Sequence, residues 1–139
     1  MKRCAFCRLI NGDTPADIVF EDTDVVVCLA VAPLNLGHAL VMPREHYPSI
    51  TEIPPRLAGH LTQVAGQTGT AAMRATGADG FNIVMATGAC AGQAVSHLSL
   101  EVIPRHPTDG VVMPARSLSY DNEQEKETIL HKMKRRLHG

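Results

Sequence analysis

Two short stretches of the chain combine residue types that could carry chemistry. Near the N-terminus, Cys4 and Cys7 form a Cys-x-x-Cys pair. This spacing lets two thiolates point at one metal ion from a short turn, and it is the usual first half of a tetrahedral metal site. Two further ligands must come from elsewhere in the chain, and spacing alone does not choose among the histidines. The candidates are His38, His46, His60, His97 and His106.

The second stretch, residues 97–103, alternates polar and apolar side chains. Successive side chains of a strand point to opposite faces, so His97, Ser99 and Glu101 share one face. The apolar residues between them form the other face, which we expect to pack on a core. The polar face either meets solvent or lines a cleft. The Gly-rich segment 86–93 just before it favours a cleft, because glycine lets a backbone approach a ligand closely.

Hydrophobic patterning predicts the elements that must position these residues. Apolar residues at helical spacing after Pro54 predict a helix that ends at Gly77. In residues 121–137 acids precede bases, an order that complements the helix dipole and predicts a second, solvated helix. The fold class is therefore α+β, in a single domain over residues 1–139. Strands are predicted over residues 18–20, 25–29, 39–42, 81–85 and 98–103.

Composition restricts the class of protein further. The chain has 139 residues, of which 45% are hydrophobic and 19% charged, and its net charge is -1. These values are typical of a globular domain. No long basic block and no run of about 18 apolar residues is present, so we expect neither nucleic acid nor a membrane as a partner. Without a signal-peptide pattern we expect a cytoplasmic protein, where four cysteines favour thiols or metal ligands over disulfides.

Several segments together resemble the histidine-triad (HIT) superfamily. The resemblance is carried by Gly92-Gln93-Ala94-Val95-Ser96-His97 with the strand that follows, by Phe81-Asn82-Ile83, by residues 37–46 and by Cys4-Ala5-Phe6-Cys7. It implies a five-stranded antiparallel sheet with a long central helix and a C-terminal helix, usually as a homodimer. It also implies nucleotide-binding proteins that hydrolyse or transfer nucleoside monophosphates through a covalent histidine intermediate.

The resemblance also implies a metal site. In the zinc-bearing branch of the superfamily, the ion is held by a Cys-x-x-Cys pair, a downstream histidine and the first histidine of the signature strand. Carried over to this sequence, these ligands are Cys4, Cys7, His46 and His97. Four protein ligands close a tetrahedral site, so the zinc is expected to be structural and to pin the N-terminus to the signature strand. If His46 swings away, the ion gains an open position and could act as a Lewis acid.

The sequence departs from the family at the catalytic positions. The signature is His-φ-His-φ-His-φ-φ, with φ apolar and the second histidine as nucleophile, and here Ser99 and Glu101 stand at the second and third positions. Glu101 adds negative charge where a phosphate would lie, which is repulsive. The family's polar nucleotide contacts are replaced by alanine at three places, whereas its loop glutamine is retained as Gln93. The alanines are Ala30, Ala86 and Ala94.

Three hypotheses for function follow from these departures. The first is a repurposed enzyme acting on a non-nucleotide small molecule, with Glu101 as general acid or base, Ser99 as its hydrogen-bonding partner and Gln93 binding an oxyanion or carbonyl. The second is a catalytically inert module that binds or regulates a partner. The third is residual hydrolysis of nucleotide phosphates, with Cys90 or Ser99 as nucleophile. The residues expected to line the substrate site are Gln93, Cys90, Ala86 and Ala30.

Overall fold

The computed structural model describes residues 4–112 and 117–138. The chain divides into two compact units, Met1–Asp109 and Gly110–Gly139, and each is described by itself below. The first unit holds the sheet and every residue that the sequence predicts for a site. Whether residues 1–139 act as a single domain stays a prediction.

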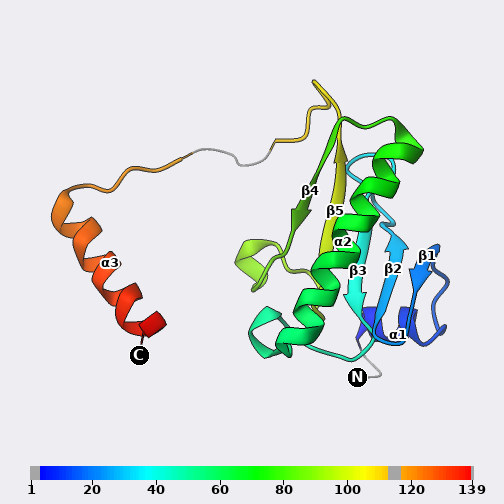
Figure 1. The fold of residues 1–139 in the computed structure, drawn as a ribbon, viewed down its shortest axis with the longest axis horizontal. Helices are drawn as coiled ribbons and strands as arrows, with labels where there is room; N and C mark the ends of the chain where they lie inside the picture. The colour runs from blue at the N-terminus through cyan, green and yellow to red at the C-terminus, as the bar shows by residue number, and fades with distance from the viewer. Residues whose placement is uncertain (1–3, 113–116, 139) are drawn as a thin grey trace. The chain divides into compact units, whose positions relative to one another are not determined.

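A five-stranded sheet forms the centre of the first unit (Figure 1). The spatial order is β1-β2-β3-β5-β4 and all neighbouring strands are antiparallel. The predicted five-stranded antiparallel sheet is confirmed, and the fold is α+β. The strands are β1 (Ile18–Glu21), β2 (Val25–Leu29), β3 (Ala39–Pro43), β4 (Gly80–Val84) and β5 (Leu100–Arg105).

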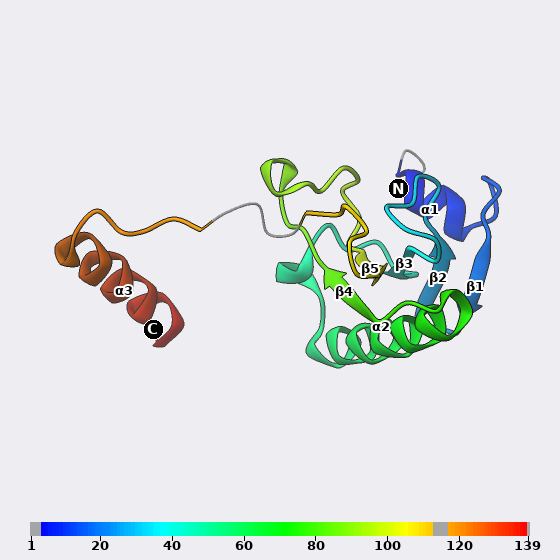
Figure 2. The ribbon, with the colours of Figure 1, turned by 90° about the horizontal axis from the view of Figure 1, so that it is seen from above.

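The long helix α2 (Pro55–Thr76) covers one face of this sheet (Figure 2). It begins with proline, which suits a first helical turn, and ends at Gly77 in the left-handed conformation. Both ends were predicted. The helix and the sheet bury a common aliphatic core, which fits a chain in which only 4% of the residues are aromatic. Its buried members are Val25, Val27, Ala39, Val41, Leu61, Val64, Ala65, Leu98, Leu100 and Val102.

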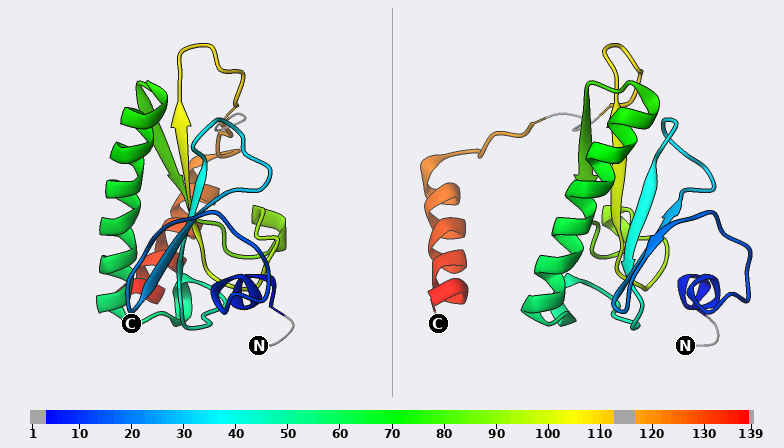
Figure 3. Two further views of the ribbon diagram at one scale, coloured as in Figure 1. Left: turned by 90° about the vertical axis from the view of Figure 1, so that its right-hand side faces the viewer. Right: turned by 45° about the vertical axis from the view of Figure 1, so that its right-hand side comes forward.

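The short helix α1 (Ala5–Ile10) lies on the opposite face of the sheet (Figure 3). Its N-cap is Cys4, whose sulfur accepts the backbone N–H of Cys7 at 3.4 Å. Partly buried apolar residues of α1 pack on a second buried cluster formed by Val26, Cys28 and Met42. This helix was not predicted, because six residues are too few for a helical period to stand out.

The loops that join these elements contain little regular structure. Two 3₁₀ turns lie in them, Ile50–Glu52 before α2 and Ala89–Ala91 between β4 and β5. The strand β5 begins at Leu100 rather than at the predicted residue 98. Residues 98–102 still alternate as predicted, with Leu98 and Leu100 fully buried on the α2 side and Ser99 and Glu101 half-buried.

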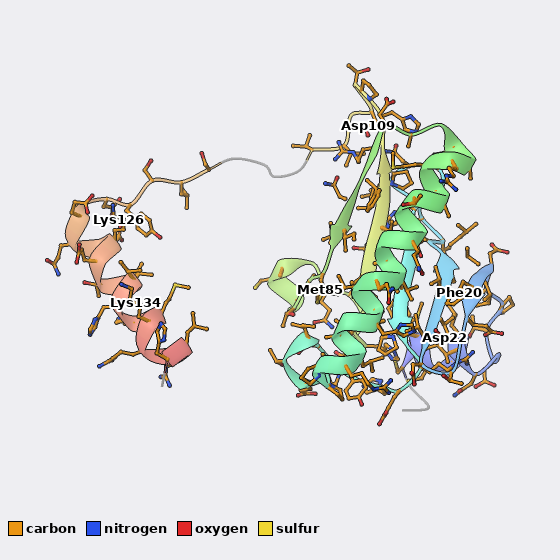
Figure 4. The ribbon with its side chains drawn as sticks, in the orientation of Figure 1. Phe20, Asp22, Met85, Asp109, Lys126 and Lys134 are labelled. Carbon is orange, nitrogen blue, oxygen red and sulfur yellow. The ribbon has the colours of Figure 1, made fainter. Side chains whose placement is uncertain are left out.

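The second unit contains α3 (Glu123–His138), close to the predicted range of 121–137. Its first turn is acidic and its last turn basic, and none of its residues is buried. Lys126 and Lys134 mark its two halves in Figure 4. Among the described residues, no helix is long and apolar enough to span a membrane.

Asp22 ties the turn between β1 and β2 to the long helix (Figure 4). Its carboxylate accepts the N–H groups of Asp24 and Val25 at 2.8 and 2.7 Å, and the Nε2 of His60 at 2.7 Å. Burial alone would raise the pKa of Asp22, but these hydrogen bonds hold it below its ordinary value. The ionised carboxylate of Asp22 therefore stabilises the folded state.

Replacing Asp22 with alanine should lower the free energy of unfolding by about 1–3 kcal/mol at pH 7, because three hydrogen bonds to a charged group are lost. The folded-state pKa is depressed, so this contribution is complete above the unfolded value of 3.8 and is lost as the pH falls through the folded value. Urea denaturation at pH 7 and below pH 3.8 measures both effects. The exposed Asp13→Ala is the control, and an equal loss in the two variants would contradict the assigned role.

The glycines of α2 provide a second test of the packing. A Cβ on Gly69 would lie 2.5 Å from the ring of Phe81, whereas one on Gly66 would meet nothing within 4 Å. We expect Gly69→Ala to destabilise the fold by about 1–3 kcal/mol through overpacking. The matched Gly66→Ala should stabilise it by up to about 1 kcal/mol through helix propensity. Thermal or urea unfolding distinguishes them, and a stabilising Gly69→Ala would show that α2 does not pack on β4 as described.

Candidate metal centre and adjoining pocket

Four side chains from three parts of the first unit converge beside α1. Cys4 and Cys7 come from the start of α1, His46 follows β3, and His97 precedes β5. Their ligand atoms all lie within 4.8 Å of one another. These are the four residues that the resemblance implied as zinc ligands.

The spacing of the ligand atoms fits a tetrahedral ion. The Sγ of Cys7 lies 3.3 Å from Nδ1 of His46 and 3.6 Å from Nδ1 of His97, and the Sγ of Cys4 lies 3.5 Å from Nδ1 of His97. With Zn–S near 2.3 Å and Zn–N near 2.0–2.1 Å, the sulfur–nitrogen edge of a tetrahedron is about 3.6 Å. Two thiolates and two imidazoles at these separations form a donor set suited to zinc.

The orientation of His97 is fixed from its far side. Its Nε2 donates a hydrogen bond to the carbonyl oxygen of Pro43 at 2.8 Å, so the Nδ1 lone pair faces the two sulfurs. Such a hydrogen bond to the second ring nitrogen is the usual support of a metal-binding histidine. Burial lowers the pKa of His97, and the nearby His46 adds to the effect. The neutral imidazole, which is the form that binds metals, is therefore favoured.

The thiol of Cys7 has its pKa shifted in the direction that disfavours metal binding. Burial raises the pKa of Cys7, and its interaction with Cys4 raises it further. A divalent cation offsets this effect, because metal binding favours the thiolate. A cation bound by the four residues would therefore hold Cys7 as the thiolate.

The other candidate histidines are used differently. His38 contacts Glu101, His60 contacts Asp22, and neither belongs to the cluster; nor does His106. Tertiary structure thus selects His46 and His97 from the five histidines that spacing left open.

The side chains of Cys4, Cys7, His46 and His97 form a candidate metal cluster. A pocket of about 110 Å³ lies next to this metal cluster, on the face of the sheet where α1 packs. Phe6 of α1 forms part of its wall and also contacts the imidazole of His97, with ring centroids 5.8 Å apart and the rings nearly perpendicular. The metal cluster and the pocket therefore share a wall. The lining residues are Phe6, Leu40, Ala86, Gly92, Gln93, Ala94, Val95, Ser99 and Glu101.

Glu101 is held in this pocket by His38, a contact that the sequence did not predict. Nε2 of His38 lies 3.1 Å from Oε1 of Glu101, and Nδ1 of His38 accepts the backbone N–H of Leu34 at 3.0 Å. Because Nδ1 is an acceptor, Nε2 carries the proton and donates a hydrogen bond to Glu101. His38 is only 4% exposed, whereas the Glu101 side chain is 40% exposed. One carboxylate oxygen is thus fixed by a buried donor while the group still faces the pocket.

The pairing of β3 with β5 explains this contact. Leu40 lies opposite Glu101 across the two strands, and His38 lies two residues before Leu40, on the same face. The contact between His38 and Glu101 can be predicted only if the pairing and register of β3 and β5 are known. No local pattern in residues 34–40 reveals it.

The remaining predicted site residues fall into two groups. Ser99, Gln93 and Ala86 line the pocket, whereas Cys90 is exposed on the loop and does not, and Ala30 also lies outside the lining. Gln93 fixes the loop, since its Oε1 accepts the N–H of Gly88 at 2.9 Å and its Nε2 donates to the carbonyl of Pro48 at 2.6 Å. The sequence did not single out Phe6, Leu40 or Val95 as pocket residues.

Comparison with known proteins agrees with this architecture. Residues 11–108 match the HIT domain family. An uncharacterized HIT-like protein of Methanocaldococcus jannaschii is 39% identical over 110 residues, covering 79% of this chain and 84% of that protein. An adenylylsulfatase of Arabidopsis thaliana is 36% identical over 106 residues, which are 76% of this chain but 54% of that protein. The chain therefore spans about half the length of that plant relative.

Solved structures show the same fold. A HIT-family protein from Bacillus subtilis matches with a TM-score of 0.83 at 28% identity, covering 96% of each chain. A zinc-bound histidine-triad family protein from Mycobacterium smegmatis matches with a TM-score of 0.77 at 29% identity, again covering 96% of each chain. The domain match, the sequence relatives and the sheet topology agree, and the chain belongs to the HIT family.

Proposed function

We propose that this protein binds a small molecule other than a nucleotide in the pocket beside the metal cluster, and that Glu101 exchanges a proton with that molecule. The observation that carries the proposal is the carboxylate of Glu101, which faces the pocket next to Ser99 while His38 holds one of its oxygens. In this role Glu101 and Ser99 are the catalytic residues.

His38, Ser99 and Gln93 have separate roles around Glu101. His38 keeps its proton on Nε2 and orients the carboxylate, leaving the second oxygen of Glu101 to accept a proton. Ser99 offers a hydroxyl whose oxygen has no hydrogen-bonding partner among the described residues. Gln93 holds the loop that closes one side of the pocket. A volume of about 110 Å³ is below the roughly 300–1,000 Å³ of common ligand pockets, which supports a small ligand.

The same residues argue against histidine-mediated transfer of a nucleotide. A serine hydroxyl is a poor nucleophile without an adjacent base, and the Glu101 carboxylate would repel a phosphate placed beside it. An adenylylsulfatase and an adenosine 5'-monophosphoramidase are among the relatives of this chain. Those activities are properties of the relatives. In this chain Ser99 stands at the position of the nucleophilic histidine, and Cys90 does not line the pocket and so cannot replace it.

We propose a structural role for zinc at the four-residue cluster. Cys4, Cys7, His46 and His97 would hold the ion, and with all four protein ligands bound it would supply cross-linking and no open coordination position. The link would join α1 to the segment before β5 and so keep Phe6 in the pocket wall.

One observation favours an inert binding module as the second candidate. The side-chain amide of Gln93 is already engaged at both ends, so it is not available in full to stabilise a developing negative charge. A module of this kind would bind the ligand without changing it. The homodimer that the resemblance implies, and the cytoplasmic location, stay predictions.

The zinc proposal predicts about one zinc per chain in purified protein. Cys7→Ser and His46→Ala should each lose most of the metal and melt at a lower temperature, because the unliganded thiols and imidazoles no longer cross-link the fold. Cys90→Ser is the matched control, since this thiol is exposed and lies outside the cluster. Mass spectrometry of the bound metal and thermal unfolding provide the readouts. A His46→Ala protein with full zinc content and unchanged melting would exclude His46 as a ligand.

The non-nucleotide proposal predicts slow turnover of an adenosine phosphoramidate. We expect AMP release at least about 10²-fold below that of a HIT protein with all three signature histidines, assayed in parallel, because the nucleophile is absent. Chromatographic quantification of AMP measures this rate. Release at the rate of the comparison enzyme, with loss of that rate in Ser99→Ala, would overturn the proposal and make Ser99 a nucleotidyl acceptor.

A further inference from the structure

The charge of the pocket is set by one residue. Glu101 is the only ionisable side chain among the described residues that line it. The neighbouring metal cluster does not offset this charge, since Zn²⁺ with two thiolates and two neutral imidazoles has no net charge. A ligand in this pocket therefore meets a negative group and no positive one.

Two side-chain acceptors of the pocket are not used by any described residue. His38 occupies Oε1 of Glu101, and no described residue bonds to the second oxygen, Oε2, or to the Ser99 hydroxyl. The one side-chain amide in the lining, that of Gln93, already donates to Pro48. A carboxylate oxygen and a hydroxyl oxygen together suit a ligand that brings several N–H donors on one atom.

The rest of the lining is apolar. Phe6, Leu40 and Val95 face the same space as Glu101, and Leu40 lies directly opposite Glu101 across the strands. An aromatic ring beside a cation adds attraction, and aliphatic side chains suit a short hydrocarbon body. The volume of about 110 Å³ limits that body to a few carbon atoms.

We propose that the pocket binds a primary ammonium group carried on a small aliphatic body. The ammonium donates to Oε2 of Glu101 and to Oγ of Ser99, and the hydrocarbon packs on Phe6 and Leu40. This inference rests on the proposed function, because it uses the same carboxylate and names the class of its ligand.

An NMR titration with three probes of nearly equal shape tests the inference on the full-length, zinc-loaded protein. The probes are isobutylammonium, isobutanol and isobutyrate, followed through the backbone amides of Gly92, Ser99 and Glu101 at pH 7. We expect the ammonium to bind at least about tenfold more tightly than the alcohol, since the ammonium forms an ion pair with Glu101 whereas the alcohol is an uncharged donor. Isobutyrate should cause no saturable shift, because two carboxylates repel.

Two variants assign the preference to the pocket carboxylate. Glu101→Gln should bring the ammonium to within about twofold of the alcohol, because the lining then holds no negative charge. Glu52→Gln, an exposed glutamate outside the pocket, should bind all three probes as the natural protein does. Ser99→Ala should weaken the ammonium more than the alcohol, because the ammonium can donate to Glu101 and Ser99 at once whereas the alcohol has a single donor.

The outcomes separate this inference from the proposed function. Equal binding of ammonium and alcohol, preferential binding of isobutyrate, or no saturable shift with the ammonium would each overturn the ammonium class. An ammonium preference that survives Glu101→Gln would overturn it as well. Rapid turnover of an adenosine phosphoramidate would instead overturn the proposed function, whatever the probes show.

Discussion

A single hydrogen bond, from Nε2 of His97 to the carbonyl oxygen of Pro43 at 2.8 Å, sets the geometry on which the site depends. It directs Nδ1 of the buried imidazole toward the sulfurs of Cys4 and Cys7. Those cysteines belong to the start of α1, so this contact aligns the imidazole with the helix that packs on the sheet beside it. Phe6 then stands against the imidazole and forms a wall of the pocket.

The two faces of the sheet differ in composition and in what covers them. The face under α2 carries an uninterrupted aliphatic core, which supplies most of the apolar burial of the first unit. The other face is covered by α1 at one side only, and beside α1 it carries Ser99 and Glu101 in the open pocket. Since the strand alternates, each polar residue of β5 on the pocket side has an apolar neighbour that anchors the strand on the core side. Among the described residues, every buried side-chain nitrogen and oxygen has a hydrogen-bonding partner.

Local patterns were sufficient to predict much of this fold. The period of two in residues 97–103 predicted which side chains of residues 98–102 enter the core and which lie on the opposite face, because alternation depends only on neighbouring residues. The proline and glycine at the ends of α2 predicted its limits for the same reason. The zinc ligands came from the family resemblance, since spacing could not choose among five histidines.

What the sequence could not supply depends on contacts between distant segments. The bond between His38 and Glu101 joins residues 63 positions apart and requires the register of β3 against β5. The helix α1 is held mainly by the sheet beneath it, so its six residues carry little pattern of their own. Cys90 and Ala30 were assigned to the pocket by position in the family pattern, and the loop and the end of β2 place them outside the lining.

Two imidazoles with the proton on Nε2 are central to this account, His97 supporting the metal cluster and His38 supporting the carboxylate. Their side-chain nitrogens can be observed directly in a long-range ¹H–¹⁵N spectrum of the zinc-loaded protein at neutral pH. We predict the Nε2–H tautomer for both, with the Nδ1 signal of His97 shifted by metal coordination and that of His38 shifted as a hydrogen-bond acceptor. An Nδ1–H tautomer at either residue would contradict the account, since Nδ1 of His97 could then not bind the metal and Nε2 of His38 would have no proton to donate to Glu101.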